Sequence, residues 1–94
     1  MLVLQKEENG KGMFYINIDG VTLAKMTYKM NTHQLMTIIH TEVDDELKGK
    51  NAGYQLVHTA VEYAREHNIK IISQCPFAKS VFDKKPEFAD VLSQ

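Results

Sequence analysis

Six residues before a helical pattern carry the clearest chemical signal in this chain. The start of a helix exposes unpaired backbone N–H groups and the positive end of the helix dipole. Behind a glycine-containing turn, such a helix start is a ready site for phosphate. Tyr54 and Gln55 follow at the helix start and are candidate contacts. The six loop residues are Lys48, Gly49, Lys50, Asn51, Ala52 and Gly53. They predict either a diphosphate-binding loop or an ordinary strand-to-helix turn with surface lysines.

Two other residues have side chains suited to nucleophilic or acid–base chemistry. Cys75 is the only cysteine and directly precedes Pro76. An exposed thiol there is a candidate nucleophile or proton donor, whereas a buried thiol is a common core residue. His40 lies near the end of a predicted strand, and imidazole is a natural general base near neutral pH. We expect this strand end to face Cys75, so that His40 activates the thiol; the alternative is a ring bonded to a backbone carbonyl.

The remaining polar and aromatic residues are interpreted as structural. His33, His58 and His67 do not have the spacing of metal ligands, so no metal site is predicted. Phe77 and Phe82 are candidate walls for a ligand, although core positions are the simpler interpretation. An acidic run is interpreted as turn residues near a helix or 3₁₀ start, and one of its members is a candidate proton acceptor from an amine. The run comprises Glu42, Asp44, Asp45 and Glu46.

These groups must be positioned by a sheet, one long helix and a short one. Asn9-Gly10 and Asp19-Gly20 are hairpin signals, and we expect a third turn near Asn31-Thr32. Alternation of apolar and polar residues then predicts strands on either side of these turns. The predicted strands cover residues 2–8, 13–18, 24–30 and 35–43.

Beyond the fourth strand the apolar residues change to a helical spacing. The stripe from Gly53 to Ala64 predicts a helix that ends near His67-Asn68. A short β-branched run at 69–73 predicts a buried strand that Pro76 interrupts. A second helix at 78–84 ends before Pro86, and residues 87–94 form a tail, with another helical turn as an option.

The fold class is therefore α+β, with a mostly antiparallel sheet. A four-strand meander gains one parallel strand through a right-handed crossover, which contains the long helix. A chain of 94 residues is long enough for a single domain, residues 1–94.

Composition narrows the function classes. A formal net charge of −1 disfavours a nucleic-acid partner, which normally requires a positive excess. A single cysteine cannot form an intramolecular disulfide and fits a reducing cytosol. The N-terminus does not have the pattern of a signal peptide, and no apolar run is long enough to span a bilayer. We therefore expect a cytoplasmic protein without a membrane partner.

Several separated motifs of residues 40–94 resemble the compact, single-domain branch of the GCN5-related N-acetyltransferases (GNAT). In that branch the loop usually reads Arg-Gly-Lys-Gly-x-Gly; here Lys48 stands for the arginine and Asn51 for the central glycine. The first 39 residues match only in style, as short strands with tight turns. The motifs, in order, are His40 to Val43, Glu46 to Gly53, Tyr63 to His67, Cys75 to Phe77 and Pro86 to Phe88.

The resemblance implies that acetyl-coenzyme A (acetyl-CoA) binds as a substrate. It implies that loop N–H groups hold the pyrophosphate and that the pantetheine arm enters a gap between the fourth and fifth strands. Backbone N–H groups near Val43 would polarise the thioester carbonyl, and a cysteine at the position of Cys75 is the suspected active-site group. Asn51 is tolerated if the family's glycine has a positive φ, because asparagine is the next most tolerant residue. If the glycine serves only for close approach, the Asn51 side chain would crowd the phosphate.

The leading hypothesis is a small N-acetyltransferase-like protein that transfers acetyl from acetyl-CoA to an unidentified amine. The alternative is a coenzyme A-binding module without turnover. A plain interaction domain that uses its sheet edge is a third hypothesis. A Cys–His hydrolase is disfavoured because nothing specifies its oxyanion hole or substrate cleft. The oligomeric state is not predicted.

Overall fold

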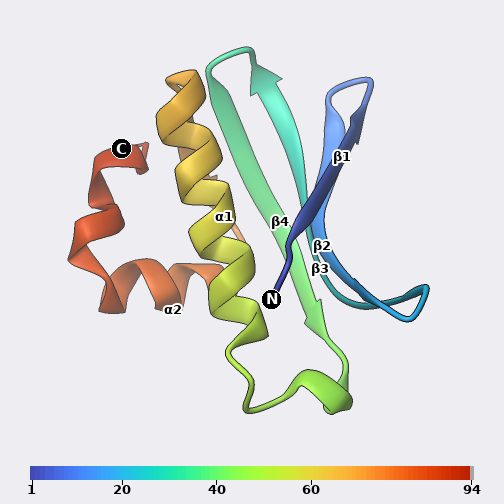
Figure 1. Ribbon diagram of the computed structural model, residues 1–94. Coiled ribbons are helices and arrows are strands. Elements are labelled where there is room, and N and C mark those ends of the chain that lie inside the picture. Colours follow the sequence, from blue (N-terminus) through green and yellow to red (C-terminus); the bar gives the residue numbers. More distant parts are fainter. Residues whose placement is uncertain (94) are drawn as a thin grey trace.

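The computed structural model describes residues 1–93 and contains one five-stranded sheet with a long helix across one face (Figure 1). The strand order is β1-β2-β3-β4-β5; the first four strands are antiparallel and β5 is parallel to β4. The α+β prediction is therefore confirmed. The elements are β1 (Leu4–Glu8), β2 (Lys11–Ile18), β3 (Val21–Thr32), β4 (Leu35–Val43), the 3₁₀ turn η1 (Asp45–Leu47), α1 (Ala52–His67), β5 (Lys70–Ser73), α2 (Pro76–Lys84) and the 3₁₀ turn η2 (Pro86–Val91).

The tight turns of the meander confirm two of the three predicted hairpins. The φ angles are 55° and 77° in Asn9-Gly10, and 51° and 81° in Asp19-Gly20. Two-residue hairpin turns require such positive φ angles. The third turn was placed too early. Thr32 belongs to β3 and pairs with Leu35, and its hydroxyl accepts the N–H of Gln34 at 3.1 Å. The turn therefore lies two residues later, at His33-Gln34.

The core lies between the sheet and α1. The predicted apolar stripe of α1 is buried, and Ala52 joins it. Phe14 of β2 contacts the rings of Tyr28 and Tyr63, with centroids 5.3 and 5.9 Å away. The Tyr28 hydroxyl donates to Glu7 and accepts from Gln5, both at 2.8 Å. Burial of this phenol raises the pKa of Tyr28 well above its usual value, because burial disfavours the charged phenolate.

The C-terminal segment packs beside α1 at the β4–β5 edge of the sheet. The start of the second helix differs from expectation, whereas the tail contains the further helical turn that was an option. The second helix begins at Pro76 rather than Ala78, because proline lacks an N–H that the first helical position would leave unpaired. The tail forms η2, and Leu92 then bridges to Ile71 of β5. Arg65 of α1 anchors η2 through the Asp90 carboxylate at 2.8 Å. Gln94 lies outside the described residues.

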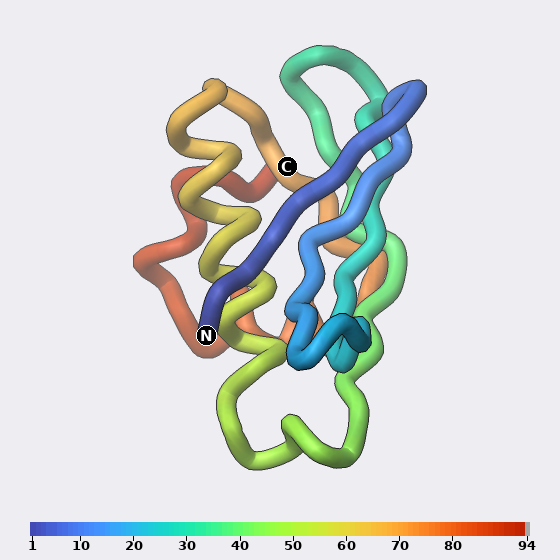
Figure 2. The backbone as a smooth tube through the Cα atoms, turned by 45° about the vertical axis from the view of Figure 1, so that its right-hand side comes forward, coloured from blue at the N-terminus to red at the C-terminus, as the bar shows by residue number. Residues whose placement is uncertain are grey.

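One connection projects beyond the rest of the chain. Figure 2 shows the segment between β4 and α1, residues 44–51, extending past the ends of the strands and the start of the helix. It contains η1, where the Asp44 carboxylate accepts the N–H of Glu46 at 3.0 Å. The acidic run thus includes a capping residue, as the turn interpretation predicted. None of the helices described is long and apolar enough to cross a bilayer.

Candidate functional site

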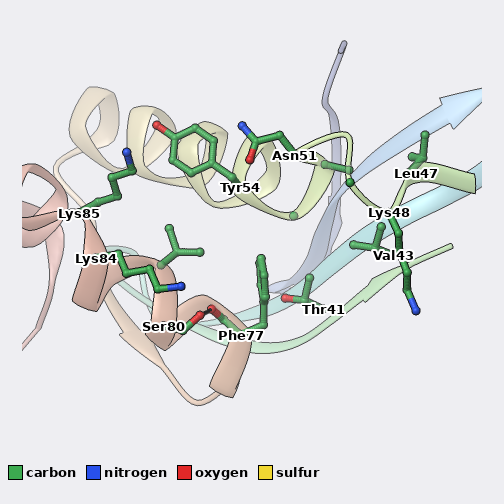
Figure 3. A pocket seen from close by; sticks show the side chains of 14 residues that line it. Thr41, Val43, Leu47, Lys48, Asn51, Tyr54, Phe77, Ser80, Lys84 and Lys85 are labelled. Atoms are coloured by element: carbon green, nitrogen blue, oxygen red, sulfur yellow. Dashed lines mark hydrogen bonds between the residues drawn. The ribbon is translucent and has the colours of Figure 1, made fainter. Parts of the chain in front are cut away.

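A cleft of about 880 Å³ opens where β4, α1 and α2 meet. Its walls are the outer end of β4, the turn before α1 with the first turn of that helix, and one side of α2 (Figure 3). Ligand sites in proteins typically have volumes of roughly 300–1,000 Å³. The cleft is therefore large enough for an extended organic ligand.

The cleft exists because β5 ends before β4 does. The last β4–β5 pair is Ile38 with Ser73, and the N–H of Gln74 still bonds the carbonyl of Ile38 at 2.9 Å. The chain then turns into α2 at Pro76, whereas β4 continues to Val43, paired with β3 alone among the described strands. Thr41 and Val43 thus line an open strand edge.

Backbone donors on this open edge point toward the cleft. Asp44 donates its N–H to the carbonyl of Leu23 on β3 at 2.7 Å. In an antiparallel pair, successive residues direct their N–H groups alternately toward and away from the partner strand. The N–H of Val43, one residue earlier, therefore points away from β3 and toward the gap beyond β5.

The turn before α1 presents a second set of donors. Asn51 is the N-cap with a φ of 65°, and Gly49 has a φ of 79°. Asn51 therefore occupies a left-handed conformation that glycine and asparagine tolerate best. Its side chain forms no capping hydrogen bond. Within the described chain, the N–H groups of residues 52–54 also lack an acceptor. This helix start can therefore donate several hydrogen bonds to an anion.

Lysines on two sides of the cleft contribute positive charge. Lys48 lines the cleft, and its ammonium is 2.9 Å from Asp45. The hydrogen bond to Asp45 raises the pKa of Lys48. Lys50 is not part of the cleft wall, whereas Lys84 at the end of α2 and Lys85 directly after it are. Sequence analysis missed these two lysines, although the helical spacing Phe77, Ser80, Lys84 places Lys84 on the same face of α2 as Phe77.

Phe77 stands at the junction of the two helices. Its side chain is 41% exposed, so the interpretation as a core residue is wrong; Phe82 is buried, as that interpretation expected. The Phe77 ring lies against Gly53, where a Cβ atom would come within 2.4 Å of Cζ. Gly53 is thus required for close approach of this ring. Tyr54, the next residue, also lines the cleft.

Cys75 and His40 are not brought together. The Cys75 side chain is buried, and its thiol donates to the Thr41 hydroxyl at 3.2 Å. Cys75 therefore lies directly behind a side chain of the cleft wall. His40 precedes Thr41 on β4 and points to the opposite face, where Nε2 is 3.1 Å from Glu42. The expectation that His40 faces Cys75 is wrong because neighbouring strand residues alternate between faces.

The other histidines occupy peripheral positions. His33 lies in the β3–β4 turn, and His67 is the last residue of α1. His58 is on α1, with Nε2 at 3.6 Å from Glu62. Among residues 1–93, no three metal-ligating side chains gather in one place.

The sequence matches the family model of the GCN5-related N-acetyl-transferase over residues 13–91. The chain belongs to this family. A GCN5-like protein from Staphylococcus aureus, solved by NMR, is similar to the chain at 38% identity with a TM-score of 0.73. The match covers 96% of this chain and 87% of that one. No curated protein sequence matches the chain.

Larger acetyltransferases share the fold of this GNAT family member. A ribosomal-protein-alanine N-acetyltransferase from Brucella melitensis has 13% identity and a TM-score of 0.63, over 93% of this chain and 64% of that one. Aminoglycoside N-acetyltransferase AAC(6')-Iy in complex with CoA has 10% identity and a TM-score of 0.60, over 82% and 67%. At these identities the likeness concerns the fold alone.

Proposed function

We propose that residues 1–94 form one acetyl-CoA-binding domain that transfers acetyl to an amine in the cytoplasm. The observation that carries this proposal is the convergence of two backbone donor sets on one cleft. The free N–H groups at the start of α1 suit the diphosphate, and the open edge of β4 suits the pantetheine arm. Loop residues Gly49 and Asn51 hold the backbone in the left-handed conformations that shape this turn. Lys50 adds charge nearby.

The transfer step uses the open edge of β4. The amine nitrogen attacks the thioester carbonyl, and the N–H of Val43 stabilises the oxyanion that forms. The carbon–sulfur bond then breaks, coenzyme A leaves as a thiolate, and the ammonium formed by the attack releases its proton to solvent water. Phe77 borders the same space.

Two roles are open to Cys75 in this proposal. The thiol protonates the departing coenzyme A thiolate through Thr41, or it attacks first and passes its acetyl group to the amine. The first role uses the hydrogen bond that the thiol already donates to the Thr41 hydroxyl. The second role requires the Thr41 side chain to rotate away, because the sulfur must bond directly to the carbonyl carbon. His40 faces solvent on the side of the sheet opposite Cys75. As a general base it would take a proton from an amine acceptor that approaches from that side.

Titration with acetyl-CoA, followed by backbone amide NMR, tests the binding proposal. We expect shifts concentrated in residues 43–55, with residues of β1 and β2 as the internal control. No shift at millimolar ligand would sink the proposal. Mass spectrometry of an amine panel incubated with acetyl-CoA then tests turnover.

A coenzyme A-binding module without turnover is the second candidate. It is favoured by the burial of Cys75, which lies behind Thr41 rather than at the cleft surface. This candidate predicts amide shifts with coenzyme A and no acetylated product from any amine. If the wild-type protein does transfer acetyl and Cys75→Ala transfers at the same rate, the proposed roles of the cysteine are wrong.

A further inference from the structure

Two lysines at the end of α2 have no acidic partner in the described chain. Neither Lys84 nor Lys85 forms an ion pair with residues 1–93. Both lysines line the cleft, and in Figure 3 the Lys85 side chain extends toward Tyr54. Their positive charge therefore borders the cleft without an acidic partner in the described chain, in contrast to that of Lys48, whose ammonium is 2.9 Å from Asp45.

The surroundings of Lys85 hold this charge in place. The ammonium lies 5.3 Å from the centroid of the Tyr54 ring, which is a cation–π distance. Tyr54 is itself stacked on Phe88 of η2, at a centroid distance of 6.1 Å. The backbone N–H of Lys85 bonds to Val81 at 3.0 Å. An aromatic platform and a helix end thus position an ammonium group while leaving it available to an anion.

The order of groups along the cleft matches the order of groups along coenzyme A. In Figure 3 the open edge of β4 with Thr41 and Val43 lies at one end, and Lys84 and Lys85 lie at the other. The start of α1 lies between them, at Asn51. Coenzyme A likewise carries its thiol at one end, its diphosphate in the middle and a 3′-phosphoadenosine at the other end.

We infer that Lys84 and Lys85, held beside Tyr54, bind the 3′-phosphate of coenzyme A and make the cleft selective for ligands that carry it. The inference rests on the proposed function. A phosphate monoester carries a charge of about −1.5 to −2 near neutral pH. Two free ammonium groups balance that charge, whereas the neutral N–H groups of α1 are suited to the diphosphate.

Calorimetric titration with coenzyme A, 3′-dephospho-coenzyme A and pantetheine tests this inference. We expect the wild-type protein to bind coenzyme A about tenfold more tightly than the dephospho form, which corresponds to one charge-assisted contact. In the double variant Lys84→Gln/Lys85→Gln this difference should disappear, because affinity falls for coenzyme A and stays unchanged for the dephospho form. Lys79→Gln removes the same charge from an exposed position of α2 outside the cleft and is the matched control.

The outcomes separate the inference from the proposed function. If the wild type binds both ligands equally, or if the double variant weakens both to the same extent, the selectivity inference is overturned while coenzyme A binding stands. If Lys79→Gln abolishes the difference as well, the effect is one of overall charge and the inference also fails. If none of the three ligands binds, the proposed function itself fails. Circular dichroism of each variant verifies that the exposed substitutions leave the fold intact.

Discussion

The inner half of β4, residues 35–38, and its outer half, residues 39–43, belong to one strand but have different surroundings. The inner half pairs with β3 on one side and β5 on the other, and Met36 and Ile38 are fully buried. The outer half pairs with β3 alone among the described strands, and Ile39 is 43% exposed. The same strand therefore supports the core in one half and lines the cleft in the other.

The boundary between the halves is set by β5 and not by β4. β5 ends at Ser73, and Pro76 starts a helix that leads the chain away from the sheet. An unpaired strand edge ordinarily invites association with other chains. Here α2 and the projecting turn border the edge, so that it becomes one wall of a cleft. The cleft is thus created by ending β5 early.

The largest expected effect is the difference in stability between one substitution in the inner half of β4 and one in the outer half. Ile38→Ala removes a fully buried side chain and should lower the free energy of unfolding by about 2–5 kcal/mol. Thr41→Ala removes one hydroxyl at the cleft and should cost about 1 kcal/mol or less. Urea unfolding of both variants measures the two costs. Equal losses would show that the outer half is as integral to the core as the inner half.

Substitutions at Asn51, in the turn before α1, should change stability by an intermediate amount. Asn51→Ala puts alanine into the left-handed conformation, which alanine tolerates less well than asparagine does. The variant should lower the free energy of unfolding by about 1–2 kcal/mol. Asn51→Gly should be close to neutral in stability, because glycine adopts a φ of 65° freely. Thermal unfolding compares the two. If alanine is as well tolerated as glycine, the left-handed conformation does not constrain this position.

The smallest expected effect concerns Tyr28, which pairs with Ile38 of the inner half. Tyr28→Phe removes the hydrogen bonds to Gln5 and Glu7 and should cost about 0.5–1.5 kcal/mol at neutral pH. Because folding raises the pKa of Tyr28, its contribution is complete below the ordinary tyrosine pKa of about 10 and is lost as the pH rises above it.

The stability gap between wild type and Tyr28→Phe should therefore narrow at high pH. Urea midpoints at about pH 8 and about pH 11 compare the two proteins on either side of the ordinary tyrosine pKa. The phenylalanine variant is the control for lysines that titrate in the same range. A gap that widens with pH would mean that the folded protein favours the phenolate, opposite to the expected sign.

Local patterns were enough to predict the sheet and the long helix. Asn-Gly and Asp-Gly turns require positive φ angles, and the apolar stripe from Gly53 to Ala64 has a helical period, so both could be assigned without tertiary information. The start of α2 was misplaced because Pro76 was interpreted as a breaker, although proline also suits the first position of a helix.

The site was harder to predict because it depends on which face a side chain occupies. His40 and Cys75 are both near strand ends, but a bulge and the alternation of β4 direct His40 to the far face. The ion pair between Lys48 and Asp45, three residues earlier, could not be predicted from composition, because it depends on the local 3₁₀ turn. Lys84 and Lys85 were missed because they are far from the loop in sequence. Only the folded structure brings them to the same cleft as the loop.

The contact between Gly53 and Phe77 has a consequence for how this protein can change. A Cβ at residue 53 and a ring at residue 77 cannot occupy the same space, since they would lie 2.4 Å apart. The two positions must therefore vary together: a larger residue at 53 is compatible only with a smaller or rotated residue at 77. A redesign of the cleft that adds a side chain at residue 53 would therefore have to move or shorten the side chain at residue 77 as well.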